Sequence, residues 1–265
     1  MLITTTLVAV LCYAIATWLQ CRRLASTAHE QLRAPIRLLG LSAFLLHGYA
    51  VYLKLHHPEG IDLSFFPVGS LIAWVVTGLV LSSSLRHRLD NLFVGVFPMA
   101  AVAALVAALT PGGGVRGAFG AGLLTHILLS LLAYSLFTIA AIQALMLSRQ
   151  EHALKQHHTR GLVASLPPLQ IMEQLLFETL WTGFLLLTVA IASGLLFVDN
   201  LFAQHLVHKT LLSLTAWAVY ALLLAGRHFL GWRSQTAVRW TLGGFLLLML
   251  GFFGSKLVLE LLLRI

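Results

Sequence analysis

The sequence predicts an all-α polytopic integral membrane protein with eight transmembrane helices, and three observations support this prediction. Of the 265 residues, 59% are hydrophobic and only 10% are charged, which is far from the usual composition of a soluble domain. The hydrophobic residues fall into eight runs, each long enough for the helix of roughly 20 residues that crosses a bilayer. Lysine and arginine alternate between the two sets of loops. We expect residues 1–265 to form a single eight-span membrane domain.

The eight runs are joined by short polar or glycine-rich segments. No basic segment precedes the first run, and its arginines follow it, so we expect an uncleaved first span rather than a signal peptide. The runs cover approximately residues 2–21, 36–55, 66–85, 92–110, 121–147, 172–198, 208–226 and 240–263.

Basic residues are unequally divided between alternate loops. Twelve of the 17 lysines and arginines lie in or beside the loops that follow the odd-numbered runs, and five lie elsewhere. Because cytoplasmic loops carry the excess of basic residues, we expect both termini on the outer, periplasmic side of a bacterial inner membrane. A net charge of +8 that follows membrane topology in this way indicates a lipid bilayer as partner and excludes nucleic acid.

The second run carries a histidine close to the predicted bilayer centre. His47 lies eleven residues after Ile36, or roughly 16 Å along a helix. An ionisable group at this depth is costly and indicates a functional site. His47 is therefore a candidate ligand or proton relay. The alternative is a neutral imidazole hydrogen-bonded to a serine or a carbonyl group of a neighbouring helix.

The third and fourth runs contain small residues and no charge in their apolar cores, which is typical of helices that pack closely together. The fifth run carries His126 a few residues inside the expected outer boundary. Ser130 and Tyr134 follow at positions four and eight residues on, so the three side chains share one helix face. Spacing alone leaves His126 equally open to a packing role and a ligand role.

The sixth and seventh runs are joined by the loop VDNLFAQHLVHK, which contains His205 and His208, and the seventh run ends on Arg227 and His228. About 20 residues, or near 30 Å of helix, separate His208 from His228. These two imidazoles are therefore expected to serve different sites.

Several segments of the second half follow one another in an order that resembles a known family. They are THILLSLLAYS, LPPLQIMEQLLFETLWTGFLLLTVAIASG, LLSLTAWAVYALLL, GWR and GFLLLMLGFFG, and they cover approximately residues 120–255. This order resembles the cytochrome c assembly protein family, the haem-handling membrane proteins of the CcmC, CcsA and HemX type. Within it, the chain resembles the small eight-span inner-membrane branch from end to end, including LLHGYAVYL in the second run.

The resemblance implies a non-covalently bound haem b and suggests which residues would hold it. His126 matches the first of two outer histidines that flank haem in the family, and His47 lies on the span that would carry an intramembrane ligand. These two are the expected iron ligands. His228 is close to the position of another intramembrane histidine, and His208 is a further outer candidate. Arg227 is the expected partner of a haem propionate, although a loop arginine also serves topology.

The chain departs from the family in its outer segments. The tryptophan-rich segment W-G-x-x-W-x-W-D is replaced by VDNLFAQHLVHKT, and no histidine follows the eighth run. We therefore expect a haem carrier or regulator rather than an enzyme, with other cytochrome c assembly or haem-synthesis proteins as partners. Two alternatives remain open: a small-solute or ion transporter, or its accessory subunit, with an intramembrane His relay, and a regulator of haem synthesis that does not transport haem.

Overall fold

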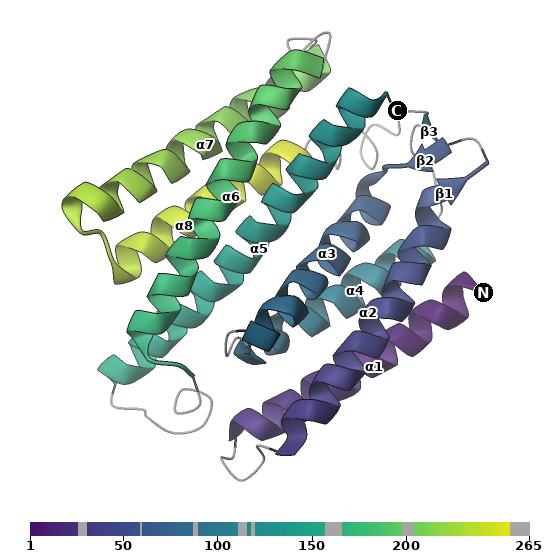
Figure 1. Ribbon diagram of the computed structural model, residues 1–265, viewed down its shortest axis with the longest axis horizontal. Coiled ribbons are helices and arrows are strands. Elements are labelled where there is room, and N and C mark those ends of the chain that lie inside the picture. Colours follow the sequence, from purple (N-terminus) through teal and green to yellow (C-terminus); the bar gives the residue numbers. More distant parts are fainter. Residues whose placement is uncertain are drawn as a thin grey trace. The chain divides into compact units, whose positions relative to one another are not determined.

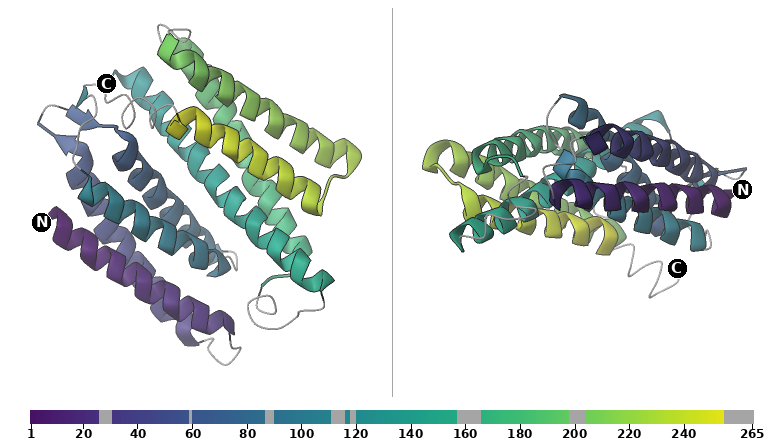
Figure 2. Two further views of the ribbon diagram at one scale, coloured as in Figure 1. Left: turned by 180° about the vertical axis from the view of Figure 1, so that it is seen from behind. Right: turned by 90° about the horizontal axis from the view of Figure 1, so that it is seen from below.

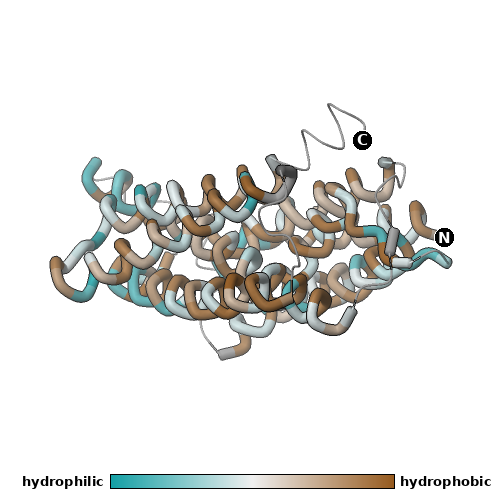
Figure 3. The backbone as a smooth tube through the Cα atoms, turned by 90° about the horizontal axis from the view of Figure 1, so that it is seen from above, coloured by the Kyte–Doolittle hydropathy of each residue, from teal (hydrophilic) through white to brown (hydrophobic). Residues whose placement is uncertain are grey.

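A computed structural model of the chain describes residues 1–25, 31–58, 60–86, 90–110, 116–117, 120–156, 166–197 and 204–254. Eight helices in these segments are long and apolar enough to cross a membrane, which confirms the predicted all-α membrane fold (Figure 1). Hydrophobic residues occupy the middle stretches of the helices, and hydrophilic residues gather toward their ends (Figure 3).

The chain divides into two compact units. The N-terminal unit contains Met1–Ala118 and Ala153–Pro167, and the C-terminal unit contains Phe119–His152 and Pro168–Ile265. Each unit has its own buried apolar core. The expectation of one membrane domain over residues 1–265 stays a prediction.

Four helices build the N-terminal unit. In Figure 2, α1 runs alongside α2, and α1 and α3 both pack against α4. At the centre, Tyr13 and Phe97 are fully buried, and a side chain on Gly40 would overlap the ring of Phe97, so glycine permits the close approach of α2 and α4. The helices are α1 (Leu2–Ala25), α2 (Arg33–Leu55), α3 (Phe65–Arg86) and α4 (Phe93–Leu109), with the short 3-10 helix η2 (Asp90–Leu92) before α4.

A small antiparallel sheet follows α2, and the sequence did not predict it. Its strands are β1 (His56–His57), β2 (Gly60–Asp62) and β3 (Arg116–Gly117), in the order β1-β2-β3. Strands of two or three residues are too short to produce an alternating pattern of hydrophobic residues. After β2, Asp62 accepts a hydrogen bond from the backbone N–H of Ser64 at 2.9 Å, immediately before α3 begins.

Four further helices build the C-terminal unit. The aromatic ring of Phe137 in α5 stacks on Tyr220 in α7 with ring centroids 4.0 Å apart, and the backbone of Gly183 in α6 approaches Phe137 closely. The helices are α5 (Ala121–Lys155), α6 (Leu169–Phe197), α7 (Gln204–Leu230) and α8 (Ser234–Met249), and α8 continues into a π-helical turn, η4 (Leu250–Gly254).

Several helices continue beyond their predicted hydrophobic runs into polar sequence, α5 and α8 among them. α5 continues to Lys155, eight residues beyond the predicted run, because its last two turns are built from good helix formers. α8 begins at Ser234 rather than near residue 240, and Gln235 in its first turn donates a hydrogen bond to Glu151 of α5 at 2.8 Å. Residues 255–263 of the eighth predicted run lie outside the described residues.

Candidate functional site

His126 lies near the beginning of α5 and contacts the facing backbone of α6. Its Nδ1 nitrogen is 2.9 Å from the carbonyl oxygen of Ala190 and 3.2 Å from the hydroxyl oxygen of Ser193. The imidazole packs directly on Gly194, where an added Cβ would lie only 3.0 Å from the Cε1 atom of the ring. A small residue at position 194 therefore creates the space that the imidazole occupies.

These contacts determine which nitrogen of His126 carries the proton. A carbonyl oxygen can only accept a hydrogen bond, so Nδ1 donates to Ala190 and the neutral ring keeps a free electron pair on Nε2. No hydrogen bond to Nε2 is found among the described residues. Imidazoles that ligate metals are usually oriented in this way, with one N–H donated to a carbonyl or carboxylate group and the other nitrogen facing the metal. The surroundings of His126 therefore fit an axial ligand of haem iron.

His47 has a different environment at the centre of the N-terminal unit. Its side chain is fully buried, with Nδ1 3.3 Å from the hydroxyl group of Tyr13 and Nε2 2.9 Å from the hydroxyl group of Ser70. These contacts join α1, α2 and α3. A neutral imidazole has one donor and one acceptor, and both are engaged here. Coordination of iron by His47 would break one of the two bonds, so the structure favours the hydrogen-bonded alternative over the predicted ligand.

Arg227, the predicted propionate partner, is already paired with a carboxylate. Its Nη1 atom is 2.7 Å from an oxygen of Glu173 in α6 and 3.2 Å from the carbonyl oxygen of Trp232, and its guanidinium group lies over the ring of Phe177. Arg233 reaches the same Glu173 oxygen at 3.4 Å. Arg227 therefore links α6 and α7 to the turn before α8.

The two remaining predicted ligands lie at opposite ends of α7 and are exposed. His228 is in the last turn beside Phe229, with ring centroids 4.8 Å apart, and His208 is in the second turn of the helix. No hydrogen bond or ring contact connects either of them with His126 in the described part of the chain. The side chain of His205 lies outside the described residues. Across the described ranges, no group of three or more His, Cys, Asp or Glu side chains could hold a metal ion.

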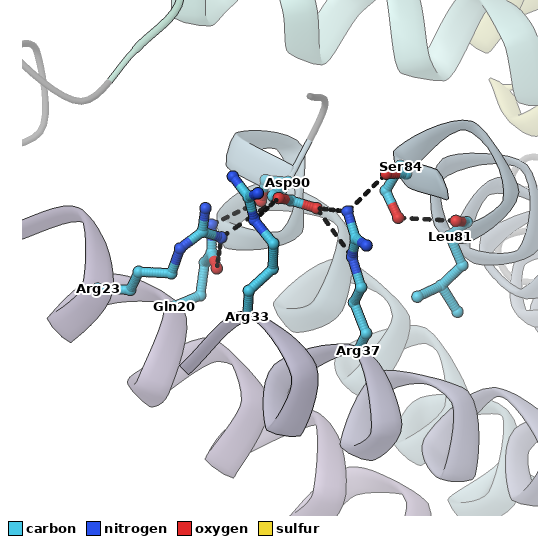
Figure 4. Close-up of polar contacts among 7 residues, drawn as sticks. All are labelled: Gln20, Arg23, Arg33, Arg37, Leu81, Ser84 and Asp90. Carbon is cyan, nitrogen blue, oxygen red and sulfur yellow. Dashed lines mark hydrogen bonds and ion pairs between the residues drawn. The ribbon is translucent and has the colours of Figure 1, made fainter. Parts of the chain in front are cut away.

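A cluster of arginines around Asp90 was missed by the sequence interpretation (Figure 4). The nearly fully buried carboxylate of Asp90 lies 2.9 Å from Arg37 Nη2, 3.0 Å from Arg33 Nε and 3.4 Å from Arg23 Nη1. Gln20 also donates to the backbone carbonyl group of Asp90 at 2.6 Å. The sequence offers one indication of this cluster. Asp90 is the only acidic residue between positions 63 and 150, and it follows the third run, on the side where basic residues are concentrated.

Comparisons with known proteins agree with the resemblance of the segments. The family model described as cytochrome C assembly protein matches residues 36–263. Inner membrane protein YpjD of Escherichia coli is 32% identical over 204 residues, which are 77% of this chain and 77% of YpjD. An uncharacterised 28.8 kDa protein of Azospirillum brasilense is 32% identical over 179 residues, 66% of each chain.

A third relative is protein HemX of Brevibacillus brevis, which is 28% identical over 209 residues, 74% of this chain and 76% of HemX. No solved structure matches the chain. The eight spans and the likeness to YpjD confirm the expected multi-pass location in the inner membrane. Together with the family match over nearly the whole chain, they establish that the chain belongs to the cytochrome C assembly protein family.

Proposed function

We propose that this protein binds haem b non-covalently through His126 and acts as a haem carrier or regulator in cytochrome c assembly. The observation that carries the proposal is the orientation of the imidazole, whose Nδ1 faces the carbonyl group of Ala190 at 2.9 Å while Nε2 has no partner in the described residues. When bound, haem iron accepts a neutral imidazole nitrogen as an axial ligand.

The residues of this chain contribute three properties to such a site. Ala190 and Ser193 hold the tautomer of His126 that leaves Nε2 available, which also raises the basicity of that nitrogen. Gly194 admits the ring between α5 and α6. The apolar helices of the membrane domain supply the non-polar surroundings that a porphyrin macrocycle requires.

Family membership supports haem as the ligand, and the sequence departures support a carrier or regulator. The chain lacks the tryptophan-rich outer segment and has no histidine after the eighth run. A haem held by one histidine is released more readily than a haem held on both faces. The function therefore involves reversible handling of haem, in contact with other assembly or haem-synthesis proteins.

The proposal is tested by purifying the protein in mild detergent, adding haem, reducing it and recording the absorption spectrum. We expect a Soret band that saturates at one haem per chain, together with the single broad visible band of a reduced haem b that carries one axial imidazole. A spectrum identical to that of haem in empty detergent micelles would contradict the proposal.

A further inference from the structure

Arginines outnumber acidic residues in the described segments around Asp90. Residues 20–25, 31–40, 84–86 and 90–92 contain five arginines and one acidic residue. They lie at the end of α1, the beginning of α2, the end of α3 and the turn before α4, on the side predicted to be cytoplasmic. The five are Arg22, Arg23, Arg33, Arg37 and Arg86, and the acidic residue is Asp90.

The arginines of the cluster differ in how far they are buried. The side chain of Arg23 is only 11% exposed, whereas those of Arg33 and Arg37 are 30% and 29% exposed. Arg37 donates from Nε and Nη2 to the Asp90 carboxylate, and Nη2 also donates to the carbonyl oxygen of Ser84 at 2.6 Å. Arg23 therefore closes the inner side of the cluster, and Arg33 and Arg37 form its accessible side.

A fourth arginine lies beside an exposed aromatic ring. The guanidinium carbon of Arg22 is 4.1 Å from the ring centroid of Trp18, and about half of the Trp18 side chain is exposed. Trp18 lies about two turns before the end of α1, and a tryptophan near the end of a transmembrane helix is typical of the boundary between hydrocarbon and headgroups. Arg22, one turn further along α1, is therefore expected at the level of the lipid phosphates.

Exposed apolar side chains continue from these arginines toward the middle of both helices. On α1, Ile15 and Leu11 follow Trp18 at spacings of three and four residues, so they lie on the same face below Arg22. On α2, Leu41 and Leu45 follow Arg37 at successive intervals of four residues, and both are exposed. Arg22 and Arg37 therefore each lie at the end of an exposed apolar stripe, and the two stripes are on neighbouring helices because α1 packs along α2.

We propose that Arg22, Arg33 and Arg37 bind the phosphate group of an anionic phospholipid whose acyl chains lie along the exposed stripes of α1 and α2. Guanidinium groups bind phosphate oxygens with two parallel hydrogen bonds, and their attraction is strong at the edge of a bilayer. A free phosphate ion would use the cations and would gain nothing from the apolar stripes. Asp90 serves as the internal counter-charge that keeps the arginines together when no lipid is bound.

The test is native mass spectrometry of the full-length protein in detergent, titrated with phosphatidylglycerol and, separately, with phosphatidylethanolamine of the same chains. The wild type should bind phosphatidylglycerol in preference to phosphatidylethanolamine. Arg22→Gln and Arg33→Gln should each weaken phosphatidylglycerol binding about fivefold, the effect expected for one basic residue near a lipid surface. The matched control is Arg239→Gln, which removes an exposed arginine from α8, in the C-terminal unit, and should leave the affinity unchanged.

Asp90→Asn separates lipid binding from a purely structural role of the cluster. This variant should have a lower melting temperature without lipid and should recover more of it than the wild type when phosphatidylglycerol is added. Equal binding of the two lipids, an unchanged affinity in both arginine variants, or an equal loss in Arg239→Gln would each overturn the proposal. Displacement of the lipid by millimolar inorganic phosphate would assign the arginines to a free anion instead.

Discussion

The Nε2 nitrogen of His47 lies 2.9 Å from the hydroxyl oxygen of Ser70, and this contact joins α2 to α3 inside the N-terminal unit. Because the Nδ1 nitrogen of the same ring faces Tyr13 on α1, one imidazole links three helices by hydrogen bonds. The cost of an ionisable side chain at mid-membrane depth is thereby offset by hydrogen bonds to a neutral ring. His47 is best explained as a structural centre of this unit.

Replacing Ser70 by alanine tests this role. The change leaves His47 Nε2 buried without its partner, so we expect the free energy of unfolding in mixed micelles to fall by about 0.6 to 2 kcal/mol. The matched control is Ser42→Ala on α2, whose exposed hydroxyl group donates to the carbonyl group of Leu38 in its own helix. The free energy of unfolding should be clearly lower for Ser70→Ala than for Ser42→Ala. Equal values for the two variants would contradict a structural role for His47.

Gly194→Ala tests the position of the imidazole of His126. The added Cβ would lie 3.0 Å from Cε1 and 3.3 Å from Nδ1, so the ring must shift by a few tenths of an ångström. We expect haem affinity to fall about tenfold, the lower end of the effect of disturbing a ligand's orientation. Gly243→Ala in α8 is the control, since its Cβ would meet nothing within 4 Å and haem affinity should be unchanged.

Glu173→Gln removes the charge that Arg227 and Arg233 share. Glu173 is almost fully buried, whereas about a third of the Arg227 side chain is exposed to solvent, so part of this interaction is screened. We expect a loss of about 1 kcal/mol in the free energy of unfolding. Glu178→Gln, on the exposed side of the same helix, should change it by less than about 0.5 kcal/mol. Similar losses in both variants would contradict a specific role for the buried pair.

The predicted topology is tested by thiol labelling in spheroplasts. Cys21 is exposed at the end of α1 that the charge distribution places in the cytoplasm. In a Cys12→Ser background, a membrane-impermeant maleimide should label Cys21 only after the membrane is opened. In a chain that lacks both native cysteines, His56→Cys should be labelled in intact spheroplasts. Labelling with the opposite sidedness would invert the predicted orientation.

The number and type of the helices were predictable because each run must satisfy its own backbone hydrogen bonds in lipid. Their ends were less predictable. The last turns of α5 extend beyond the hydrophobic run. Helix propensity and contacts such as the hydrogen bond between Gln235 and Glu151 stabilise these turns. The sheet at His56–His57 gave no signal, because strands of two residues show no periodicity.

The candidate site residues could be predicted from the sequence, but their hydrogen-bond partners could not. The sequence identified His47 and His126 by depth and by family resemblance, but it could not show that Ser70 and Tyr13 reach both nitrogens of His47. It also gave no reason to pair Arg227 with Glu173, 54 residues away. Such pairings depend on how separate helices pack, which the pattern of one chain does not contain.

The central claim is that His126, through Nε2, is the haem ligand of this protein. It is tested most directly by haem titration of the wild type, His126→Ala and His47→Ala, each followed by its Soret absorbance and checked for folding by its melting temperature. We expect His126→Ala to lose at least about tenfold in affinity, while folded His47→Ala keeps the affinity and the spectrum of the wild type. Wild-type affinity and an unchanged spectrum in His126→Ala would contradict the claim.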